Sequence, residues 1–441
     1  MRNFSLSVVA ALVFAAGHSL HAQTSPLRYR TQSYTVDSGL HSGKGAQSEA
    51  QVAFSTTVKA AGVPWIRLSF SEVSLGKRSY LTLTSLYDGA VQRLDAGALA
   101  QWQNSSAYFN GDAVKLDLYV AAADRNVFVR MNQVMVGFES GDPETQCGPV
   151  DDRVASTDDR AARLLNVGCT AWLIEDGRLV SAGHCVSSSG SLNTVEFNVP
   201  PSLPNGIIQH PGPEDQYAVN VATRVFSDAG IGNDWGVFET FPNSQTGLTP
   251  LQAQGVFFNV AQDLTPPVIR ITGYGIDDGS ANQTQQTSTG PNAGSSGTTM
   301  RYKTDTEGGN SGSPVIDEAT GNAVGVHTNG GCLTNGGGSN SGTSTFNTAL
   351  WAQIGNNGGG DEITLTARVR QQGNRARASL RWDPADGGEV DILRNGVVVQ
   401  TTADDGSTVD NLSGMTGSFT YQVCETDSGT CSNEATVTVS L

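Results

Sequence analysis

The chain has 441 residues, a formal net charge of -16 and 52 glycines, and 38% of its residues are hydrophobic. This length predicts about three domains. The acidic balance argues against nucleic acid and anionic membranes as partners, because both need a basic face that displaces counterions.

The first 22 residues have the pattern of a secretory signal peptide. Arg2 gives a positive start, an apolar run extends from Leu6 to Gly17, and the small residue Ala22 ends the segment. A transmembrane anchor is the alternative, but the run is shorter than the ~20 residues that a bilayer requires. We therefore expect residues 1–22 to be removed from an exported protein, periplasmic or extracellular, that has no membrane anchor.

The region that follows, residues 23–146, carries the alternation of β-strands. Ile66, Leu68 and Phe70 are apolar and alternate with polar neighbours. A period of two with one apolar face indicates half-buried antiparallel strands. We predict a β-sandwich here, either a pro-segment or an accessory domain, and the polar stretch 139–153 after it has the composition of a linker.

Residues 362–441 predict a second β-sandwich. Leu380 and Trp382 alternate with polar residues, and Asn395-Gly396 is the sequence of a tight hairpin turn. The stretches "LRWDPA", "VDILRNG" and "YQVCE" resemble a fibronectin type III module.

The middle region, residues 147–355, combines short strands with long polar loops. One helix is expected near its end, in "STFNTALWAQIG", with Ser344 or Thr345 as N-cap and a stop at Gly355.

Six cysteines fit the oxidising compartment that an exported chain meets. Two local disulfides are expected because each pair flanks a predicted hairpin: Cys169 with Cys185, and Cys424 with Cys431. Cys147 and Cys332 remain, and their pairing would connect the start of the middle region to its end. Two free or intermolecular thiols are the alternative.

The middle region also holds the elements of a nucleophilic serine site. A serine hydroxyl needs a histidine to take its proton and a carboxylate to hold that histidine. "VSAGHC" supplies His184 after an apolar strand, "GNDWGVFE" supplies Asp234 at the start of another, and "DTEGGNSGSPVID" surrounds Ser311 with glycines. Gly309 and Ser311 would offer two backbone N–H groups to an oxyanion, which requires a path without a Cβ in the way.

Each of these motifs has an ordinary interpretation when it is taken alone: a surface histidine beside a disulfide, a turn, or a polar loop. Together, in the order His, Asp, Ser, the motifs "VSAGHC", "NDWGVFE" and "GGNSGSPV" make residues 148–355 resemble a chymotrypsin-type (trypsin-like) serine protease domain. The resemblance implies that His184 is the general base, Asp234 the orienting carboxylate and Ser311 the nucleophile.

The resemblance also implies two antiparallel β-barrels with the site between them. The expected fold is therefore all-β, with a double-barrel protease domain flanked by N-terminal and C-terminal β-sandwiches. Asn310 stands where the animal digestive members have Asp, so activation through a salt bridge to a new N-terminal amine is not expected.

The stretches "GGNSGSP" and "GVHTNGGC" are similar to the bacterial branch that contains the glutamyl endopeptidases. Bacterial lysyl endopeptidases share the Thr-Glu-Gly-Gly lead-in and a similar cysteine layout, which favours a Cys147–Cys332 bond.

Substrate specificity has two candidate determinants. His327 matches the histidine that glutamyl endopeptidases place in the S1 pocket, and with the hydroxyl of Thr306 it would provide donors for a carboxylate. Asp305 instead matches the carboxylate that binds Lys or Arg in trypsin-like members. A separate alternative is that His327 merely packs beneath the pocket, as the histidine that lysyl endopeptidases also have here would suggest. We expect cleavage after Glu, including a cut at Glu144 in the chain's own linker, with Lys/Arg specificity through Asp305 as the alternative.

A catalytically silent secreted binding or adhesion protein is the competing functional class, and a polysaccharide ligand for the sandwiches is a further one. Intact His184, Asp234 and Ser311 argue against silence, and no aromatic stripe supports a sugar site. The expected partners are polypeptide substrates. No cofactor and no metal are expected, because the six histidines lack paired spacing to Cys, Asp or Glu, and the sequence leaves the oligomeric state open.

Overall fold

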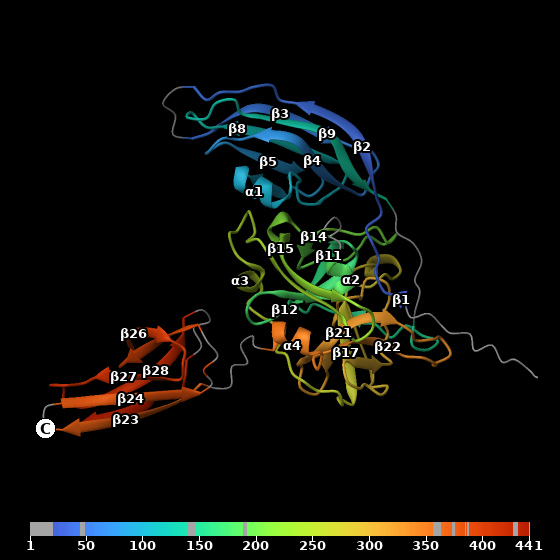
Figure 1. Ribbon diagram of the computed structural model, residues 1–441. Helices are drawn as coiled ribbons and strands as arrows, with labels where there is room; N and C mark the ends of the chain where they lie inside the picture. The colour runs from blue at the N-terminus through green and yellow to red at the C-terminus, as the bar shows by residue number, and fades with distance from the viewer. Residues whose placement is uncertain are drawn as a thin grey trace, which may run out of the picture.

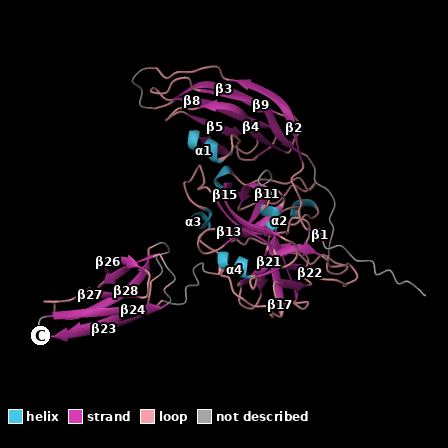
Figure 2. Cartoon of the chain, viewed as in Figure 1, coloured by secondary structure: helices cyan, strands magenta, loops and turns pink. Residues whose placement is uncertain are grey.

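The structure is a computed structural model, and it describes residues 21–44, 49–138, 146–187, 192–355, 363–372, 375–383, 385, 388–426 and 431–440. Three bodies built mostly of β-strands follow one another along the chain (Figures 1 and 2). The all-β fold class is thereby confirmed. Most of the expected signal peptide and the expected autolytic site Glu144 lie outside the described residues.

The N-terminal body is a sandwich of two four-stranded sheets. One sheet contains β2 (Tyr29–Asp37), β9 (Phe128–Gly137), β4 (Trp65–Ser74) and β7 (Phe109–Asn110). The other contains β3 (Gln51–Lys59), β8 (Ala113–Val120), β5 (Tyr80–Ser85) and β6 (Val91–Leu94), and the short helix α1 (Ala96–Gln101) follows β6. The alternating apolar residues predicted from the sequence meet between the sheets in one core.

Arg67 departs from the half-buried pattern expected for β4, because its side chain is buried as well. Its guanidinium donates to Ser106 O at 2.9 Å and to the hydroxyl of Tyr108 at 3.0 Å. The chain before β7 therefore covers the second face of this strand, which the sequence pattern could not show.

The middle body begins with a closed antiparallel barrel. Its strands, in their order around the barrel, are β11 (Ala161–Asn166), β12 (Cys169–Leu173), β13 (Leu179–Ser181), β16 (Asp234–Thr240), β15 (Gln216–Asp228) and β14 (Leu192–Glu196). Helix α2 (Gly183–Val186) lies between β13 and β14, the short 3-10 turn at Pro213–Asp215 lies between β14 and β15, and helix α3 (Pro250–Gln254) follows β16. Buried residues from all six strands fill the barrel.

An eight-stranded antiparallel sheet completes the middle body. Its main path is β10 (Val154–Ala155), β18 (Gln286–Pro291), β17 (Val268–Gly273), β20 (Pro314–Asp317), β21 (Ala323–Gly330), β22 (Asn340–Ser344) and β19 (Thr299–Tyr302). A second 3-10 turn, Gly279–Ala281, precedes β18. The eighth strand, β1 (His21–Ala22), comes from the N-terminus and pairs with β21.

The helix expected at the end of this body is α4 (Thr348–Ile354), and its predicted N-cap was wrong. Ser344 is the last residue of β22, and the cap is Asn347, whose side-chain oxygen accepts from the N–H groups of Ala349 and Leu350. The strand therefore uses residues that the sequence pattern assigned to the helix start, while the helix ends at Gly355 as predicted.

The C-terminal body is a sandwich of three and four strands. One sheet contains β23 (Thr364–Gln372), β24 (Arg375–Asp383) and β27 (Ser407–Asn411), and the other contains β26 (Val397–Ala403), β25 (Glu389–Arg394), β28 (Gly417–Glu425) and β29 (Ala435–Val439). Asn395 and Gly396 join β25 to β26 with φ angles of 52° and 77°, as a two-residue hairpin turn requires. The likeness to a fibronectin type III module stays a prediction.

The N-terminal sandwich is docked on the barrel. Trp65 and Tyr108 of the sandwich are buried together with Leu165 and Ile208 of the middle body. Tyr108 N–H donates to the side-chain oxygen of Gln216 at 2.9 Å, and the Gln216 amide donates back to Tyr108 O at 2.8 Å. These paired contacts fix the sandwich in one orientation, above β14 and β15 in Figure 1.

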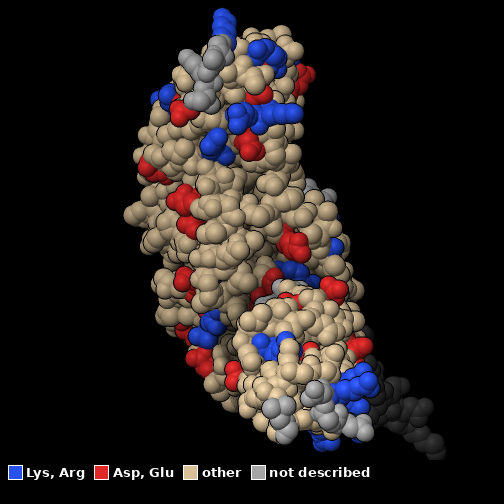
Figure 3. Space-filling view, turned by 90° about the vertical axis from the view of Figure 1, so that its left-hand side faces the viewer, with Lys and Arg blue, Asp and Glu red and all other residues tan. Residues whose placement is uncertain are grey.

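Three disulfides join the six cysteines: Cys147–Cys332, Cys169–Cys185 and Cys424–Cys431. These are the same pairs that the sequence and its resemblance suggested. No helix of the described chain combines the length and the apolar character that crossing a bilayer would need. Figure 3 shows Lys and Arg interspersed with Asp and Glu on the face turned to the viewer.

Candidate active site

His184 and Asp234 lie next to each other. His184 is in α2 directly after β13, and its Nδ1 is 2.6 Å from Oδ2 of Asp234 at the start of β16. The backbone N–H of His184 donates to Oδ1 of the same carboxylate at 2.9 Å. Because a carboxylate can only accept, Nδ1 carries the proton of the neutral ring and Nε2 is left as a proton acceptor.

Thr343 of β22 holds Asp234 from the opposite sheet. Its hydroxyl accepts from Asp234 N–H at 3.0 Å and donates to Asp234 O at 2.7 Å. The backbone that carries the carboxylate is therefore held by the second sheet as well, and Thr343 is a positioning residue that the sequence did not indicate.

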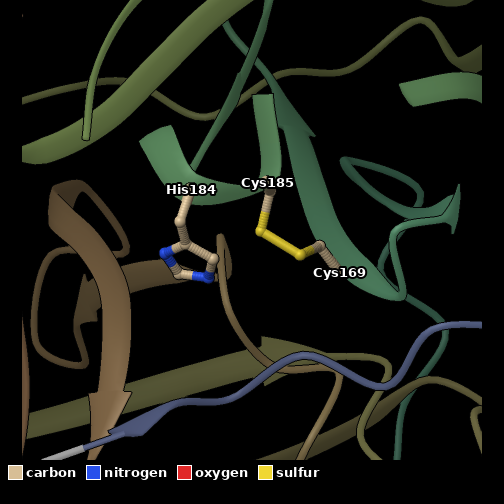
Figure 4. Close-up of side chains that lie close together, drawn as sticks. All are labelled: Cys169, His184 and Cys185. Carbon is tan, nitrogen blue, oxygen red and sulfur yellow. A yellow bond between two sulfur atoms is a disulfide. The ribbon is translucent and has the colours of Figure 1, made fainter. Parts of the chain in front are cut away.

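The Cys169–Cys185 disulfide anchors the helix that carries His184 (Figure 4). The two sulfurs and the imidazole lie within 4.8 Å of one another, a spacing that would suit a metal ion if the thiols were free. Since the sulfurs are bonded to each other, they are not available as thiolate ligands. The disulfide therefore serves to place α2 on β12.

Two glycines shape the loop that carries Ser311. Gly309 and Gly312 have φ angles of 106° and 90°. A Cβ would lie 2.3 Å from Tyr274 O at Gly309 and 2.1 Å from Thr170 O at Gly312. Only glycine fits at either position, because both the conformation and the space exclude a side chain.

This loop directs two backbone N–H groups at one oxygen. Gly309 N–H and Ser311 N–H both donate to the carbonyl oxygen of Gln23, at 2.6 and 3.1 Å. The structure thus brings together the two groups that the sequence pattern named as oxyanion donors. The group that they hold is part of the chain's own N-terminal segment.

The hydroxyl of Ser311 does not contact the imidazole. It donates to Thr328 O at 3.1 Å and accepts from Gln23 N–H at 2.9 Å. Nε2 of His184 is buried and has no hydrogen-bond partner within the described chain. Cys185 Sγ lies 3.8 Å from Ser311 O, so the serine and the histidine are neighbours. Catalytic hydrogen bonds of this kind often form only with a productively bound substrate.

The side chain of Gln23 ends among four residues of the second sheet, which we call the donor site: Tyr302, Thr306, His327 and Asn340. Its Oε1 accepts from the Thr306 hydroxyl at 2.8 Å and contacts Nε2 of His327. Its Nε2 donates to Thr306 O at 3.2 Å. Because an amide oxygen only accepts, His327 carries its proton on Nε2.

Tyr302 sets this tautomer of His327. Its hydroxyl is 2.6 Å from Nδ1 of the ring, which has no proton left to give and therefore accepts. Burial, followed by the charge of His184, lowers the pKa of His327 to about 3. Burial also raises the pKa of Tyr302 well above its usual value. Both groups are thus neutral at neutral pH, and each donates in a defined direction.

Asn340 orients the hydroxyl of Thr306, as Tyr302 orients the ring of His327. Its Nδ2 donates to the Thr306 hydroxyl at 2.7 Å and to Thr304 O at 2.8 Å, so the hydroxyl proton is left for Gln23. Tyr302 and Asn340 face each other in the pairing of β19 with β22. Neither was predicted, because strand pairing across 38 residues leaves no local signal in the sequence.

Asp305, the alternative specificity residue, is buried beside the donor site and is engaged elsewhere. Its two carboxylate oxygens accept from the N–H groups of Cys147 at 2.6 Å and Asp152 at 2.9 Å. Burial raises the pKa of Asp305. In this structure its carboxylate holds the loop that enters the middle body.

Residues 169–326 match the trypsin-like peptidase domain family. The match supports a chymotrypsin-type family for the middle body, and the chain is a serine endopeptidase, a hydrolase of peptide bonds. No curated protein sequence matches the chain.

Two solved structures resemble part of the chain. A Glu endopeptidase in complex with MPD is 20% identical, covers 47% of this chain and 99% of its own, and has a TM-score of 0.36. A thermostable serine protease, AL20, from an extremophilic microorganism is 16% identical, covers 44% of this chain and 93% of its own, and has a TM-score of 0.34. At these values neither likeness carries an argument about activity.

Proposed function

We propose that this chain is an exported endopeptidase in which Ser311 is the nucleophile, His184 the general base and Asp234 the group that orients it. Nε2 of His184 would take the serine proton as Oγ attacks the peptide carbonyl, and would then return it to the leaving amine. The N–H groups of Gly309 and Ser311 would hold the oxyanion, a contribution of about 10²-fold or more in turnover for each donor.

The proposal divides the chain as the sequence suggests. Residues 1–22 are a signal peptide, 23–146 an N-terminal sandwich, 147–355 the protease domain and 362–441 an accessory sandwich. Polypeptides are the substrates.

We propose further that cleavage follows Glu. The observation that carries this proposal is the convergence of two donors, Nε2–H of His327 and the hydroxyl of Thr306, on one side-chain oxygen at the end of the donor site. A substrate carboxylate would accept both as charge-assisted hydrogen bonds. A Lys or Arg side chain would bring further donors against them, and the Asp305 carboxylate already accepts two backbone N–H groups.

Chromogenic peptides ending in Glu, Gln, Asp, Lys and Arg test this specificity. Rates are divided by the concentration of enzyme that reacts with a fluorophosphonate, so that chains whose serine is not accessible are left out of the comparison. Glu peptides should have the highest kcat/KM, and His327→Ala should remove that preference. A preference for Lys or Arg that Asp305→Asn abolishes and His327→Ala leaves intact would refute it.

The nucleophile has its own test. Ser311→Ala should reduce turnover by about 10⁶-fold, as expected when the three residues act as one unit. Fluorophosphonate labelling should disappear with it. Ser313→Ala is the matched control, since its hydroxyl has no hydrogen-bond partner in the described chain. Labelling at another residue, with activity retained in Ser311→Ala, would disprove the assignment.

A further inference from the structure

We infer that residues 21–27, which we call the strap, are a built-in, substrate-like inhibitor of the active site, with Gln23 as the residue that occupies the donor site. This inference rests on the proposed function, because it assigns a resting state to the same Ser311 site. It also gives the N-terminal sandwich a role, since the sandwich carries the strap.

The backbone of the strap crosses the site as an extended chain. On one side of Ser311, His21 and Ala22 pair antiparallel with Gly330 and Asn329 of β21. On the other side, the N–H groups of Ser25 and Leu27 donate to carbonyl oxygens of the barrel, Gly168 O at 2.8 Å and Asn166 O at 3.1 Å. Backbone pairing on both sides of the nucleophile is the way in which an extended peptide is held by β-augmentation.

Gln23 places the Gln23–Thr24 bond at the reacting position. Its carbonyl oxygen accepts hydrogen bonds from the N–H groups of Gly309 and Ser311, and its own N–H donates to the hydroxyl of Ser311. Its amide fills the donor site with two contacts to Oε1 and one from Nε2. Figure 4 shows the N-terminal chain, in blue, passing below the imidazole of His184.

The same geometry explains why the strap acts as an inhibitor. The Ser311 hydroxyl donates its proton to Thr328 O and not to a general base. Nε2 of His184 correspondingly has no hydrogen-bond partner in the described chain. The bond is therefore bound at the site without the proton acceptor that attack requires. Occupation without turnover keeps the site closed to other peptides.

The strap is also held in place from its C-terminal end. Leu27 is buried in the cluster that joins the N-terminal sandwich to the barrel, and β2 begins two residues later at Tyr29. Docking of the sandwich thus gives the strap a high effective concentration at the site, which a free peptide of the same sequence lacks. Loss of this docking, after a cut between the sandwich and the protease domain, would let the strap leave.

The carbonyl and side-chain contacts of Gln23 do not depend on where the leader is removed, although its N–H would become a terminal amine after cleavage at Ala22. Cleavage after Ala22, as the sequence predicts, would take away the two pairs with β21. The carbonyl and amide contacts belong to Gln23 itself, and they remain when it is the first residue.

The test compares the full chain with Gln23→Ala and with the control Gln51→Ala, an exposed glutamine of β3 in the same sandwich. Wild type and control should hydrolyse a Glu peptide slowly and react slowly with a fluorophosphonate. Gln23→Ala should be faster in both by roughly 10- to 100-fold, because three hydrogen bonds to the strap are lost. Equal thermal midpoints would show that the variant is folded.

A peptide supplies the reverse experiment. His-Ala-Gln-Thr-Ser-Pro-Leu, the sequence of the strap, should inhibit the Gln23→Ala chain competitively, and the same peptide with Ala for Gln should need at least a tenfold higher concentration.

Two results would overturn the inference in distinguishable ways. Equal, fast rates in wild type and Gln23→Ala would disprove the strap while leaving the protease assignment intact. Absence of hydrolysis and labelling in every chain, Gln23→Ala included, would instead refute the proposed function on which the strap depends.

Discussion

Replacing Tyr302 by Phe removes one hydroxyl from the donor site and leaves the ring in the core. The hydroxyl is 2.6 Å from Nδ1 of His327, and both side chains are buried. Without it, Nδ1 becomes a buried acceptor that lacks a donor, and the ring loses the contact that keeps its proton on Nε2. We expect this change to weaken recognition of Glu while leaving the serine untouched.

The size of the effect follows from the buried contact. When the substrate requires the proton on Nε2, Nδ1 is left as an unsatisfied buried acceptor, and this tautomer then costs ~1–3 kcal/mol that the free ring can avoid by moving its proton. At 1.4 kcal/mol per factor of ten, kcat/KM for Glu peptides should fall about 5- to 150-fold. The change should lie mainly in KM, because the contact holds the side chain of the substrate in the ground state and the transition state alike.

Tyr217→Phe is the matched control, since the hydroxyl of Tyr217 is buried in the first barrel and has no hydrogen-bond partner in the described chain. Its kinetics should equal those of wild type. Because the strap also contacts His327, both substitutions are tested in the Gln23→Ala chain. There the rate of reaction with phenylmethylsulfonyl fluoride, which needs no Glu side chain, should be unchanged by Tyr302→Phe. Wild-type kcat/KM in that variant, or an equal loss with the sulfonyl fluoride, would refute the reasoning about the tautomer.

Three further outcomes are expected. Burial lowers the pKa of His210, and that of His327 to about 3. The unfolded chain therefore binds more protons than the folded one below the ordinary histidine pKa of ~6.5, and the free energy of unfolding should fall as pH drops from 6.5 towards 3. Urea titrations at pH 7.5 and 5.0 would show it, and a higher free energy of unfolding at pH 5.0 would contradict it. Removing the Cys169–Cys185 bond, with a sequence separation of 16, should cost roughly 3 kcal/mol and impair turnover, whereas loss of the disulfide in the C-terminal sandwich should leave turnover intact. The KM of Glu peptides should rise as pH increases above the ordinary Glu pKa of ~4.3 while that of Gln peptides stays flat, because a buried carboxylate raises the pKa of the neighbouring His327 from about 3 and the complex takes up a proton; identical pH profiles for the two peptides would exclude this coupling.

The sequence was most informative where chemistry restricts the backbone locally. The glycines around Ser311 are required by positive φ angles and by the carbonyl oxygens of Tyr274 and Thr170, and such a loop can be recognised without a structure. The alternation in β4 likewise predicted one apolar face. It could not predict that the other face is covered, since the cover for Arg67 comes from the chain near Ser106.

Long-range contacts were beyond the sequence for a physical reason. The pairing of Tyr302 with Asn340 depends on the order of strands in a sheet, and Gln23 reaches Ser311 across 288 residues. No local propensity or spacing records either contact. The prediction of the α4 N-cap was wrong for a different reason. Serine is a favourable N-cap residue, but Ser344 is the last residue of β22 and is paired within the sheet.

Glutamine at position 23 suits an inhibitory strap better than glutamate, the residue proposed for substrates, would. A glutamine amide is neutral, so the donor site can bury it beside a neutral His327 without taking up a proton. Its nitrogen has an acceptor of its own in Thr306 O at 3.2 Å, and a carboxylate oxygen in that place would meet another oxygen. A glutamate must also lose its hydration on entering, a cost that the two donors have to offset. The strap therefore uses the contacts of a substrate while avoiding the charge of one in the donor site, so the side chain of Gln23 adds no pH dependence of its own to binding.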